Sequence, residues 1–214
     1  MTEVVLVHGA WHGAWCWDQV VDCLAKRDVP SNAVELPFTG FVDDVATVRA
    51  AVESAAPDAI VCGHSYGGLV VDAAVAGTAL SRVVYFAAIV NIGTDVLAGL
   101  PNPLADAIRG DGEWCWVDPE RATALFYGDA EPEVADAACR RLRPMVLDAA
   151  ALTSAPPRPL APTTYVVCEE DGAVPPRAQR RIAVYCDKMF QWPTDHSPFL
   201  SWPGTVADVL LGAD

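Results

Sequence analysis

One stretch of the chain, residues 58–72, constrains the fold more than any other. An apolar run leads into the sequence GHSYG at residues 63–67, and a segment rich in alanine and valine with helical spacing follows. This order predicts a buried strand, a sharp turn and a helix, with Ser65 at the apex. Glycines flank the apex, where a Cβ atom would collide with a neighbouring strand or helix. The stretch therefore predicts a nucleophile elbow, a strained turn that lifts a serine hydroxyl above the sheet.

Apolar runs elsewhere in the chain alternate with segments of helical periodicity. Besides the elbow strand, we expect strands at Glu3–Val7, Asn32–Leu36, Arg82–Ala88, Thr163–Cys168 and Lys188–Trp192. Helices are expected near residues 17–24, 43–52, 66–77, 175–185 and 197–211, the second of them capped by Asp43 or Asp44. Strands that alternate with helices predict a mostly parallel six-stranded sheet flanked by helices. Ligands of such sheets bind at the carboxyl ends of the strands, which is the edge where Ser65 is expected.

The stretch from about residue 91 to residue 162 has a different character. It holds many of the 17 prolines, the pair Trp114 and Trp116, and short helical pieces such as Pro132–Leu142. It is too long for a plain connection in a compact α/β domain. We therefore expect a single domain, residues 1–214, in which residues 91–162 form a small helical cap over the carboxyl edge of the sheet.

The charge balance limits the partners that the protein can have. The 214 residues carry 28 acidic and 14 basic side chains, a net charge of −14, which argues against nucleic acid and against an anionic membrane surface. The seven cysteines are widely spaced and show no pattern of zinc ligands, so we expect reduced thiols in a cytoplasmic protein. The N-terminal apolar run is too short for a signal peptide, and no run is long enough to span a membrane. A small-molecule ester is the expected partner, for a monomer or a homodimer.

A serine hydroxyl is a poor nucleophile until a base removes its proton, and that base must be oriented by a third group. Enzymes with this type of elbow supply these groups in the chain order Ser, then Asp or Glu, then His. Of the four histidines, only His196 follows Ser65 in a loop after a predicted strand. His196 is therefore the predicted base.

The predicted acid comes from three carboxylates that follow a strand, Glu169, Glu170 and Asp171. Asp171 precedes a glycine in the turn, from where its side chain can point along the sheet edge toward His196. Glu169 and Glu170 are the alternatives, and we expect both to lie in a solvated turn. Asp195 is next to His196 in sequence and is badly placed to reach Nδ1 of that imidazole.

The oxyanion of a tetrahedral intermediate needs two backbone N–H donors. The N–H of Tyr66, directly after the serine, and that of Ala10, in the loop after the first strand, fit these roles. His8 is expected to bond within its own loop. The residues expected at the wall of an apolar pocket are Trp11, His12, Trp114 and Trp116, with Trp15 and Tyr66 as further candidates. No cofactor and no metal ion is expected.

Four segments together resemble small α/β-hydrolases, a family that includes plant methylesterases, hydroxynitrile lyases and bacterial carboxylesterases. They are residues 5–15 (VLVHGAWHGAW), 63–68 (GHSYGG), 165–175 (YVVCEEDGAVP) and 195–200 (DHSPFL). The resemblance implies an α/β-hydrolase fold. It also implies the same site residues, with Ser65, Asp171 and His196 as the catalytic triad and Ala10 and Tyr66 as the oxyanion donors.

Two positions depart from the lyases of that family. Hydroxynitrile lyases of this type carry a threonine where this chain has Ala10 and a lysine where it has Ser197, so the resemblance implies ester hydrolysis over cyanohydrin cleavage. We therefore expect a serine hydrolase that cleaves a carboxylic ester, lactone or thioester of a small apolar molecule, aromatic or not, through an acyl-enzyme on Ser65. Two alternatives stay open. One is a tailoring cyclase or lyase on the same scaffold, and the other is a ligand-binding, receptor-like protein with little turnover.

Overall fold

The centre of the molecule is a six-stranded sheet. The computed structural model describes residues 2–90, 92–93, 96–146 and 158–213. The strand order is β2-β1-β3-β4-β7-β8, and every neighbouring pair is parallel. The strands are β1 (Val4–Val7), β2 (Ser31–Val34), β3 (Ile60–His64), β4 (Arg82–Phe86), β7 (Thr163–Cys168) and β8 (Lys188–Trp192). The predicted six-stranded parallel sheet is confirmed.

Most strand boundaries agree with the sequence prediction, and the two clearest differences have physical causes. Strand β4 ends before Ala87, whose left-handed backbone (φ 45) turns the chain away from the sheet. Strand β2 begins and ends earlier than the predicted Asn32–Leu36 because it pairs with only four residues of β1, from Val4↔Ser31 to Val7↔Val34.

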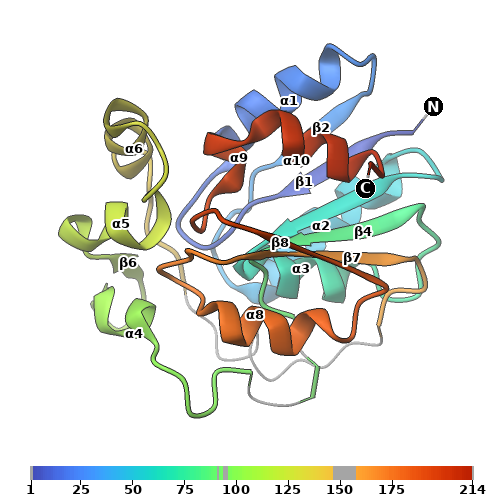
Figure 1. Ribbon diagram of the computed structural model, residues 1–214. Helices are drawn as coiled ribbons and strands as arrows, with labels where there is room; N and C mark the ends of the chain where they lie inside the picture. The colour runs from blue at the N-terminus through green and yellow to red at the C-terminus, as the bar shows by residue number, and fades with distance from the viewer. Residues whose placement is uncertain (1, 91, 94–95, 147–157, 214) are drawn as a thin grey trace.

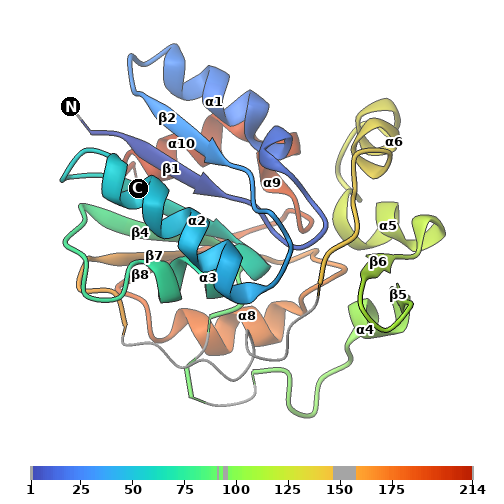
Figure 2. The same cartoon turned by 180° about the vertical axis from the view of Figure 1, so that it is seen from behind.

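Side chains of alternate strand residues enter two separate cores. Val5 and Val7 pack with α2 (Phe41–Ser54), α3 (Tyr66–Ala74) and α8 (Pro176–Ala183) on one face. Val4 and Leu6 pack with α1 (Asp18–Ala25) and α10 (Pro203–Leu210) on the other. Figure 1 shows α1 and α10 in front of the sheet, and the reverse view in Figure 2 brings α2 and α3 forward. Burial on both faces explains why the inner strands β1, β3, β4 and β7 are mostly apolar, whereas the edge strands β2 and β8 hold exposed residues.

The C-terminal segment holds two helices, where the sequence analysis expected one over residues 197–211. Helix α9 (Pro198–Ser201) ends at Trp202, and α10 begins at Pro203. A proline has no N–H for the helical hydrogen bond, and it disfavours helical backbone in the residue before it. Trp202 accordingly has φ −127 and ψ 48, so the prediction of one continuous helix was wrong.

Helix α2 begins earlier than predicted, with Gly40 at its N-cap. Asp43 and Asp44 lie in its first turn, so the prediction that one of them caps the helix was wrong. The Asp44 side chain is fully buried instead. Its carboxylate accepts hydrogen bonds from the Phe38 N–H at 2.9 Å and the Tyr66 O–H at 2.7 Å. Asp44 therefore connects the loop after β2 to the first residue of α3.

A cap stands between β4 and β7 in the chain. It contains α4 (Pro103–Ala107), β5 (Ile108–Gly110), β6 (Cys115–Val117), α5 (Pro119–Phe126) and α6 (Pro132–Cys139). In Figures 1 and 2 the cap lies beyond the edge toward which the sheet strands point. The antiparallel pair β5–β6 was not predicted, because strands of three residues show no periodic pattern. Parts of the predicted range 91–162, residues 91, 94–95 and 147–157, lie outside the described residues.

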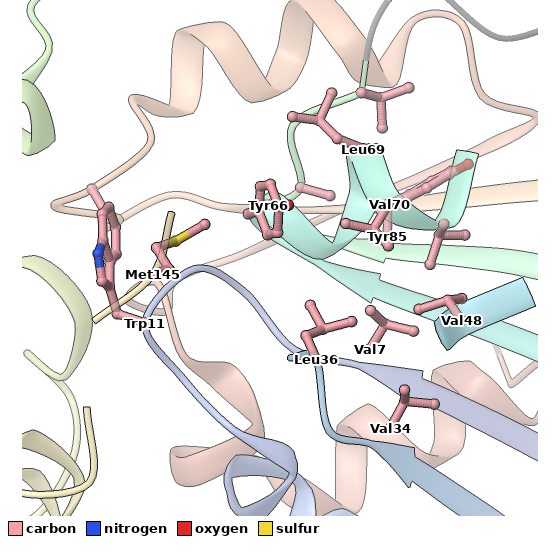
Figure 3. Close-up of a cluster of buried hydrophobic side chains, with 14 of the residues drawn as sticks. Val7, Trp11, Val34, Leu36, Val48, Tyr66, Leu69, Val70, Tyr85 and Met145 are labelled. Atoms are coloured by element: carbon pink, nitrogen blue, oxygen red, sulfur yellow. The ribbon is translucent and has the colours of Figure 1, made fainter. Parts of the chain in front are cut away.

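The core beneath α2 and α3 continues from the sheet into the cap. In Figure 3, Trp11 and Met145 lie beyond the ends of the strands, past Tyr66. Met145 exchanges backbone hydrogen bonds with Cys115 at 2.8 and 3.0 Å, and the Trp11 C=O accepts one from the Arg143 N–H at 2.9 Å. The loop after β1 is thus held by the cap.

The structure also bears on membrane-spanning segments and on the state of the cysteines. Within the described ranges no helix is long and apolar enough to cross a membrane. All seven cysteines lie in the described part of the chain, and each is a free thiol.

We predict that Gly67→Ala destabilises the fold. A Cβ at this position would lie 2.6 Å from the His8 carbonyl oxygen and 2.8 Å from that of Val7, and these backbone atoms cannot move without disturbing β1. The free energy of unfolding should fall by about 1–3 kcal/mol, measured by urea denaturation. The control is Gly204→Ala in α10, where a Cβ meets nothing within 4 Å. Equal stability of the two variants would contradict the close approach of α3 to β1.

Candidate active site

Ser65 joins β3 to α3 in a strained conformation. Its φ is 50, in the left-handed region that a serine seldom adopts. The Ser65 N–H donates to the Phe86 carbonyl at 3.2 Å, and the Ser65 carbonyl accepts from the Ile89 N–H at 3.0 Å. Although Ser65 is the N-cap of α3, its side chain makes no capping hydrogen bond. The loop after β4 therefore holds the strained backbone, and the hydroxyl is not used for capping.

Left-handed backbone is concentrated around this turn. Asp28, between α1 and β2, is one of five described non-glycine residues with positive φ, and the other four are Ser65, Trp11, Phe38 and Ala87, with φ between 45 and 61. Each of the four lies in the connection that follows one of the neighbouring strands β1 to β4. Such strain costs on the order of 1–3 kcal/mol per residue and gathers at functional sites. Four of the five described non-glycine residues with positive φ therefore lie at the carboxyl edge of the sheet.

The loop after β1 lies against the elbow. A Cβ on Gly9 would be 2.8 Å from Nδ1 of His64 and 2.9 Å from Cβ of Ser65, so only a glycine fits between them. Ala10 follows Gly9, and Tyr66 is the first residue of α3. The structure thus brings the segments of both predicted oxyanion donors to Ser65.

His196 and Asp171 form a buried hydrogen-bonded pair. His196 Nδ1 lies 2.7 Å from Asp171 Oδ2, and their side chains are 1% and 0% exposed. The other carboxylate oxygen, Oδ1, accepts from the N–H groups of Ala173 at 2.7 Å and Val174 at 2.8 Å. A carboxylate oxygen in this arrangement accepts, so Nδ1 of His196 donates to Asp171 and Nε2 is the ring nitrogen outside this bond. Among the described residues, no hydrogen bond joins Ser65 Oγ to His196.

Gln179 is a site residue that the sequence analysis missed. It is fully buried in α8, and its Nε2 donates to Asp171 Oδ2 at 2.8 Å and to the Val174 carbonyl at 2.8 Å. Its Oε1 accepts from the Cys168 N–H at 2.9 Å. Gln179 therefore binds the same carboxylate oxygen of Asp171 as the histidine and helps to fix its position. The available signal was a polar residue on the same helical face as Ile182, three positions later.

The other two carboxylates of the predicted acid turn point elsewhere. Glu170 is exposed, as expected. Glu169 is partly exposed and accepts a hydrogen bond from Arg180 at 2.6 Å. Neither is bonded to a histidine in the described structure.

His64 contacts the loop after β8, which carries the predicted base His196. Its Nε2 lies 2.9 Å from the His196 carbonyl oxygen, and the two imidazole rings are 4.6 Å apart. Burial, with His196 and His12 nearby, lowers the pKa of His64 well below its ordinary value. His64 is therefore neutral, and its Nε2–H donates to the His196 carbonyl.

His8 and His12 are both buried in the loop after β1. His8 bonds within its loop through Nδ1 and the Gly9 carbonyl at 2.9 Å, as predicted, and its Nε2 accepts from the Leu36 N–H at 3.1 Å. His12 Nδ1 lies 2.8 Å from the Ala10 carbonyl oxygen, and its Nε2 lies 2.8 Å from the Tyr127 hydroxyl. Chiefly through burial, the pKa of His8 falls to about 3 and that of His12 to about 4.

Two of the tryptophans predicted for a pocket wall line a cavity of the cap. Trp11 is 3% exposed, and its Nε1–H donates to the Cys115 carbonyl at 3.2 Å. Trp11 and Trp116 line a cavity of about 230 Å³ whose lining includes neither Ser65 nor His196. Their contact with a substrate stays a prediction.

Trp114 and Trp15 have other surroundings. Trp114 lies in the β5–β6 turn, where its N–H donates to the Asp111 carboxylate at 2.9 Å. Trp15 lines another cavity, of about 380 Å³, whose lining includes neither Ser65 nor His196, and the Arg141 guanidinium covers its ring at 4.6 Å from the centroid. No group of three His, Cys, Asp or Glu side chains that could hold a metal ion occurs in the described part of the chain.

Comparison with known proteins assigns the chain to a family. A model described as the alpha/beta hydrolase family matches residues 4–209, so the chain belongs to the α/β-hydrolase family and the predicted fold is confirmed. An α/β-hydrolase of Aspergillus novofumigatus is 27% identical over 98% of this chain and 95% of its own length. A pheophorbidase of Raphanus sativus is 27% identical over 100% of this chain and 94% of its own. The crystal structure of polyneuridine aldehyde esterase shares the fold, with a TM-score of 0.84, 22% identity, and coverage of 99% of this chain and 98% of that one.

We predict that the protein loses stability as the pH falls from 7 to 5. The pKa values of His8, His12 and His64 are lowered in the folded state, so the unfolded chain, where histidine titrates near about 6.5, binds more protons. His8 and His12 should each contribute a loss of about 2 kcal/mol over this range, and His64 should add to the loss in the same direction. Burial raises the pKa of Asp72 to about 6, which offsets part of the loss. Urea denaturation at pH 7, 6 and 5 measures the trend, and constant or rising stability toward pH 5 would contradict the neutral histidines.

Proposed function

We propose that this α/β-hydrolase is a serine esterase that cleaves a carboxylic ester of a small apolar molecule through an acyl-enzyme on Ser65. The observation that carries the proposal is the buried hydrogen bond between His196 Nδ1 and Asp171 Oδ2, at 2.7 Å, beside the strained serine turn. A structural pair alone would not require a left-handed serine next to it. The relatives named pheophorbidase and polyneuridine aldehyde esterase agree with ester chemistry.

In the proposed reaction Ser65 Oγ attacks the acyl carbon and His196 Nε2 takes the hydroxyl proton. The protonated His196 then gives this proton to the leaving alcohol. A water molecule attacks the acyl-enzyme in the second half of the reaction, with His196 again as the base. The 4.6 Å between the rings of His64 and His196 supports this assignment, since His64 directly precedes the serine.

Asp171 orients the base and stabilises the imidazolium that forms during the reaction. Its carboxylate accepts from two backbone N–H groups and from Gln179, in addition to His196. These contacts keep the acid fixed while His196 gains and loses a proton. The N–H groups of Ala10 and Tyr66 are the proposed donors to the oxyanion.

A tailoring enzyme that performs cyclisation, elimination or lyase chemistry is the second candidate, since the same family scaffold is compatible with it. Ser197 follows the base where a lysine would serve cyanohydrin cleavage. Ser197 is 1% exposed and its N–H donates to Asp195 Oδ1, so this position supplies no cation. Ester hydrolysis is therefore favoured over that lyase reaction. Product analysis with an unbiased panel of esters and lactones separates the two candidates.

Ser65→Ala should reduce ester turnover by about 10³-fold or more, because the catalytic residues act as a unit. The same change should abolish labelling by a fluorophosphonate probe. Turnover of aryl esters and labelling in gel measure the two effects. Labelling that persisted in the variant would place the nucleophile at another residue.

Asp171→Asn should reduce kcat by orders of magnitude, since the amide favours the wrong tautomer of His196. Glu170→Gln is the matched control, one residue earlier in the same turn, and should keep turnover within about twofold because an exposed surface side chain contributes little. Steady-state kinetics with circular dichroism as a check of folding measures both variants. Greater damage from Glu170→Gln would show that the acid is misassigned.

A further inference from the structure

The cap meets the site through one short segment, residues 124–129, which comprises the end of α5 and the turn that follows. This segment contacts three loops that carry the proposed catalytic groups. They are the acid loop after β7, the base loop after β8, and the oxyanion loop after β1. The contacts are made by backbone and side-chain groups of consecutive residues, so one rigid helix end reaches all three loops.

The acid loop packs directly on the α5 backbone. A Cβ on Gly172, the neighbour of Asp171, would collide with the Ala124 carbonyl oxygen and lie 3.2 Å from Cα of Leu125. There is no room for a side chain between loop and helix. The position of α5 therefore limits the position of Asp171.

The base loop is joined to the segment by reciprocal hydrogen bonds. The Asp129 N–H donates to Asp195 Oδ2 at 3.0 Å, and the Asp195 N–H donates to Asp129 Oδ2 at 2.7 Å. Asp195 Oδ1 also accepts from the Ser197 N–H at 2.8 Å. The Phe126 ring lies 5.5 Å from the imidazole of His196. The residues on both sides of the base are thus fixed by one bonded aspartate pair.

The oxyanion loop is joined to the same turn by the Tyr127 hydroxyl. Tyr127 is 1% exposed and lies 2.8 Å from His12 Nε2, while His12 Nδ1 lies 2.8 Å from the Ala10 carbonyl oxygen. A neutral imidazole has one donor and one acceptor nitrogen. Nδ1 faces a carbonyl and must donate, so Nε2 accepts from the Tyr127 O–H. Two successive hydrogen bonds therefore connect the cap to Ala10.

We infer that Tyr127 and Asp129 are positioning residues, which set the oxyanion loop and the base loop in register with each other. The inference rests on the proposed function, and it makes the cap part of the catalytic framework in addition to any role as a pocket wall. Neither side chain touches the reacting atoms. A misplacement of about 1 Å in a catalytic group can cost about 100-fold in rate, so loss of either bond should be visible in turnover.

Tyr127→Phe removes only the hydroxyl and leaves His12 Nε2 without its donor. We expect kcat for an aryl ester to fall by about 10- to 100-fold, with KM changed by less than about threefold, because the loss acts on the transition state. The control is Tyr185→Phe, since Tyr185 is 56% exposed and lies between α8 and β8. If Tyr127 had only a structural role, Tyr127→Phe would lower the free energy of unfolding without lowering kcat at nearly constant KM.

The aspartate pair predicts a specific pattern among three variants. Asp129→Ala removes the acceptor for the Asp195 N–H and should lower kcat about tenfold, whereas Asp129→Asn keeps an acceptor oxygen and should retain turnover within about twofold. Asp195→Asn should be as harmful as Asp129→Ala, because both Asp195 oxygens face N–H groups and the amide would turn its own N–H toward one of them. Asp118→Asn controls for α5 stability, since Asp118 caps the far end of that helix.

Amide hydrogen exchange, followed by mass spectrometry, tests the positioning independently of turnover. We expect faster exchange in residues 9–13 of Tyr127→Phe and in residues 194–198 of Asp129→Ala, with neither effect in Tyr185→Phe or Asp118→Asn. Wild-type protein that hydrolyses no ester and resists fluorophosphonate would defeat the proposed function, and the exchange data would then decide the inference alone. If both loops of the variants exchanged at the wild-type rate, the inference would be overturned. Faster exchange in the variants together with wild-type turnover in an active enzyme would also overturn the inference.

Discussion

Ser65 keeps its left-handed backbone because hydrogen bonds and close packing from neighbouring segments fix the turn on both sides. The Phe86 carbonyl and the Ile89 N–H hold both sides of the turn, and Gly67 lets α3 approach the end of β1 more closely than any side chain would permit. The strain costs on the order of 1–3 kcal/mol. Burial of the sheet on both faces offsets it, and the same packing aligns the carboxyl ends of the strands. The position of every other site residue follows from that alignment.

The site combines the buried Asp171 carboxylate with buried neutral imidazoles of His12 and His64. Asp171 accepts hydrogen bonds from four donors, which compensates for the removal of its charge from water. His12 and His64 have lowered pKa values and each donates one N–H to a backbone carbonyl. Protonation of either would place a second charge in a region that has no solvent to stabilise it. The imidazoles next to His196 therefore stay neutral, and the Asp171 carboxylate is the group that pairs with it.

The sequence was sufficient for the parts of the molecule that local patterns encode. Strand β7 has the predicted boundaries because burial on both faces produces an uninterrupted apolar run. Strand β8 also has them, although it is an edge strand in which three of the five residues are exposed. The strained turn at Ser65 and the contact between Asp171 and His196 agree with the elbow pattern and the chain order. Gln179, Tyr127 and the role of Asp44 were not predicted, since each acts through a partner on another segment of the fold. The break before Pro203 was encoded locally and was overlooked, whereas β5 and β6 are too short to leave a periodic signal.

The central claim is that Ser65 carries the acyl group during turnover. The most direct measurement mixes the enzyme with p-nitrophenyl acetate, quenches in acid within the first turnover, and locates the acetyl group by peptide mass spectrometry. The account predicts acetylation of Ser65 that appears with the first release of nitrophenol and disappears as water completes the reaction. An acetyl group found transiently on another residue would contradict this account. So would release of nitrophenol with no detectable acyl-enzyme under conditions in which deacylation limits the rate.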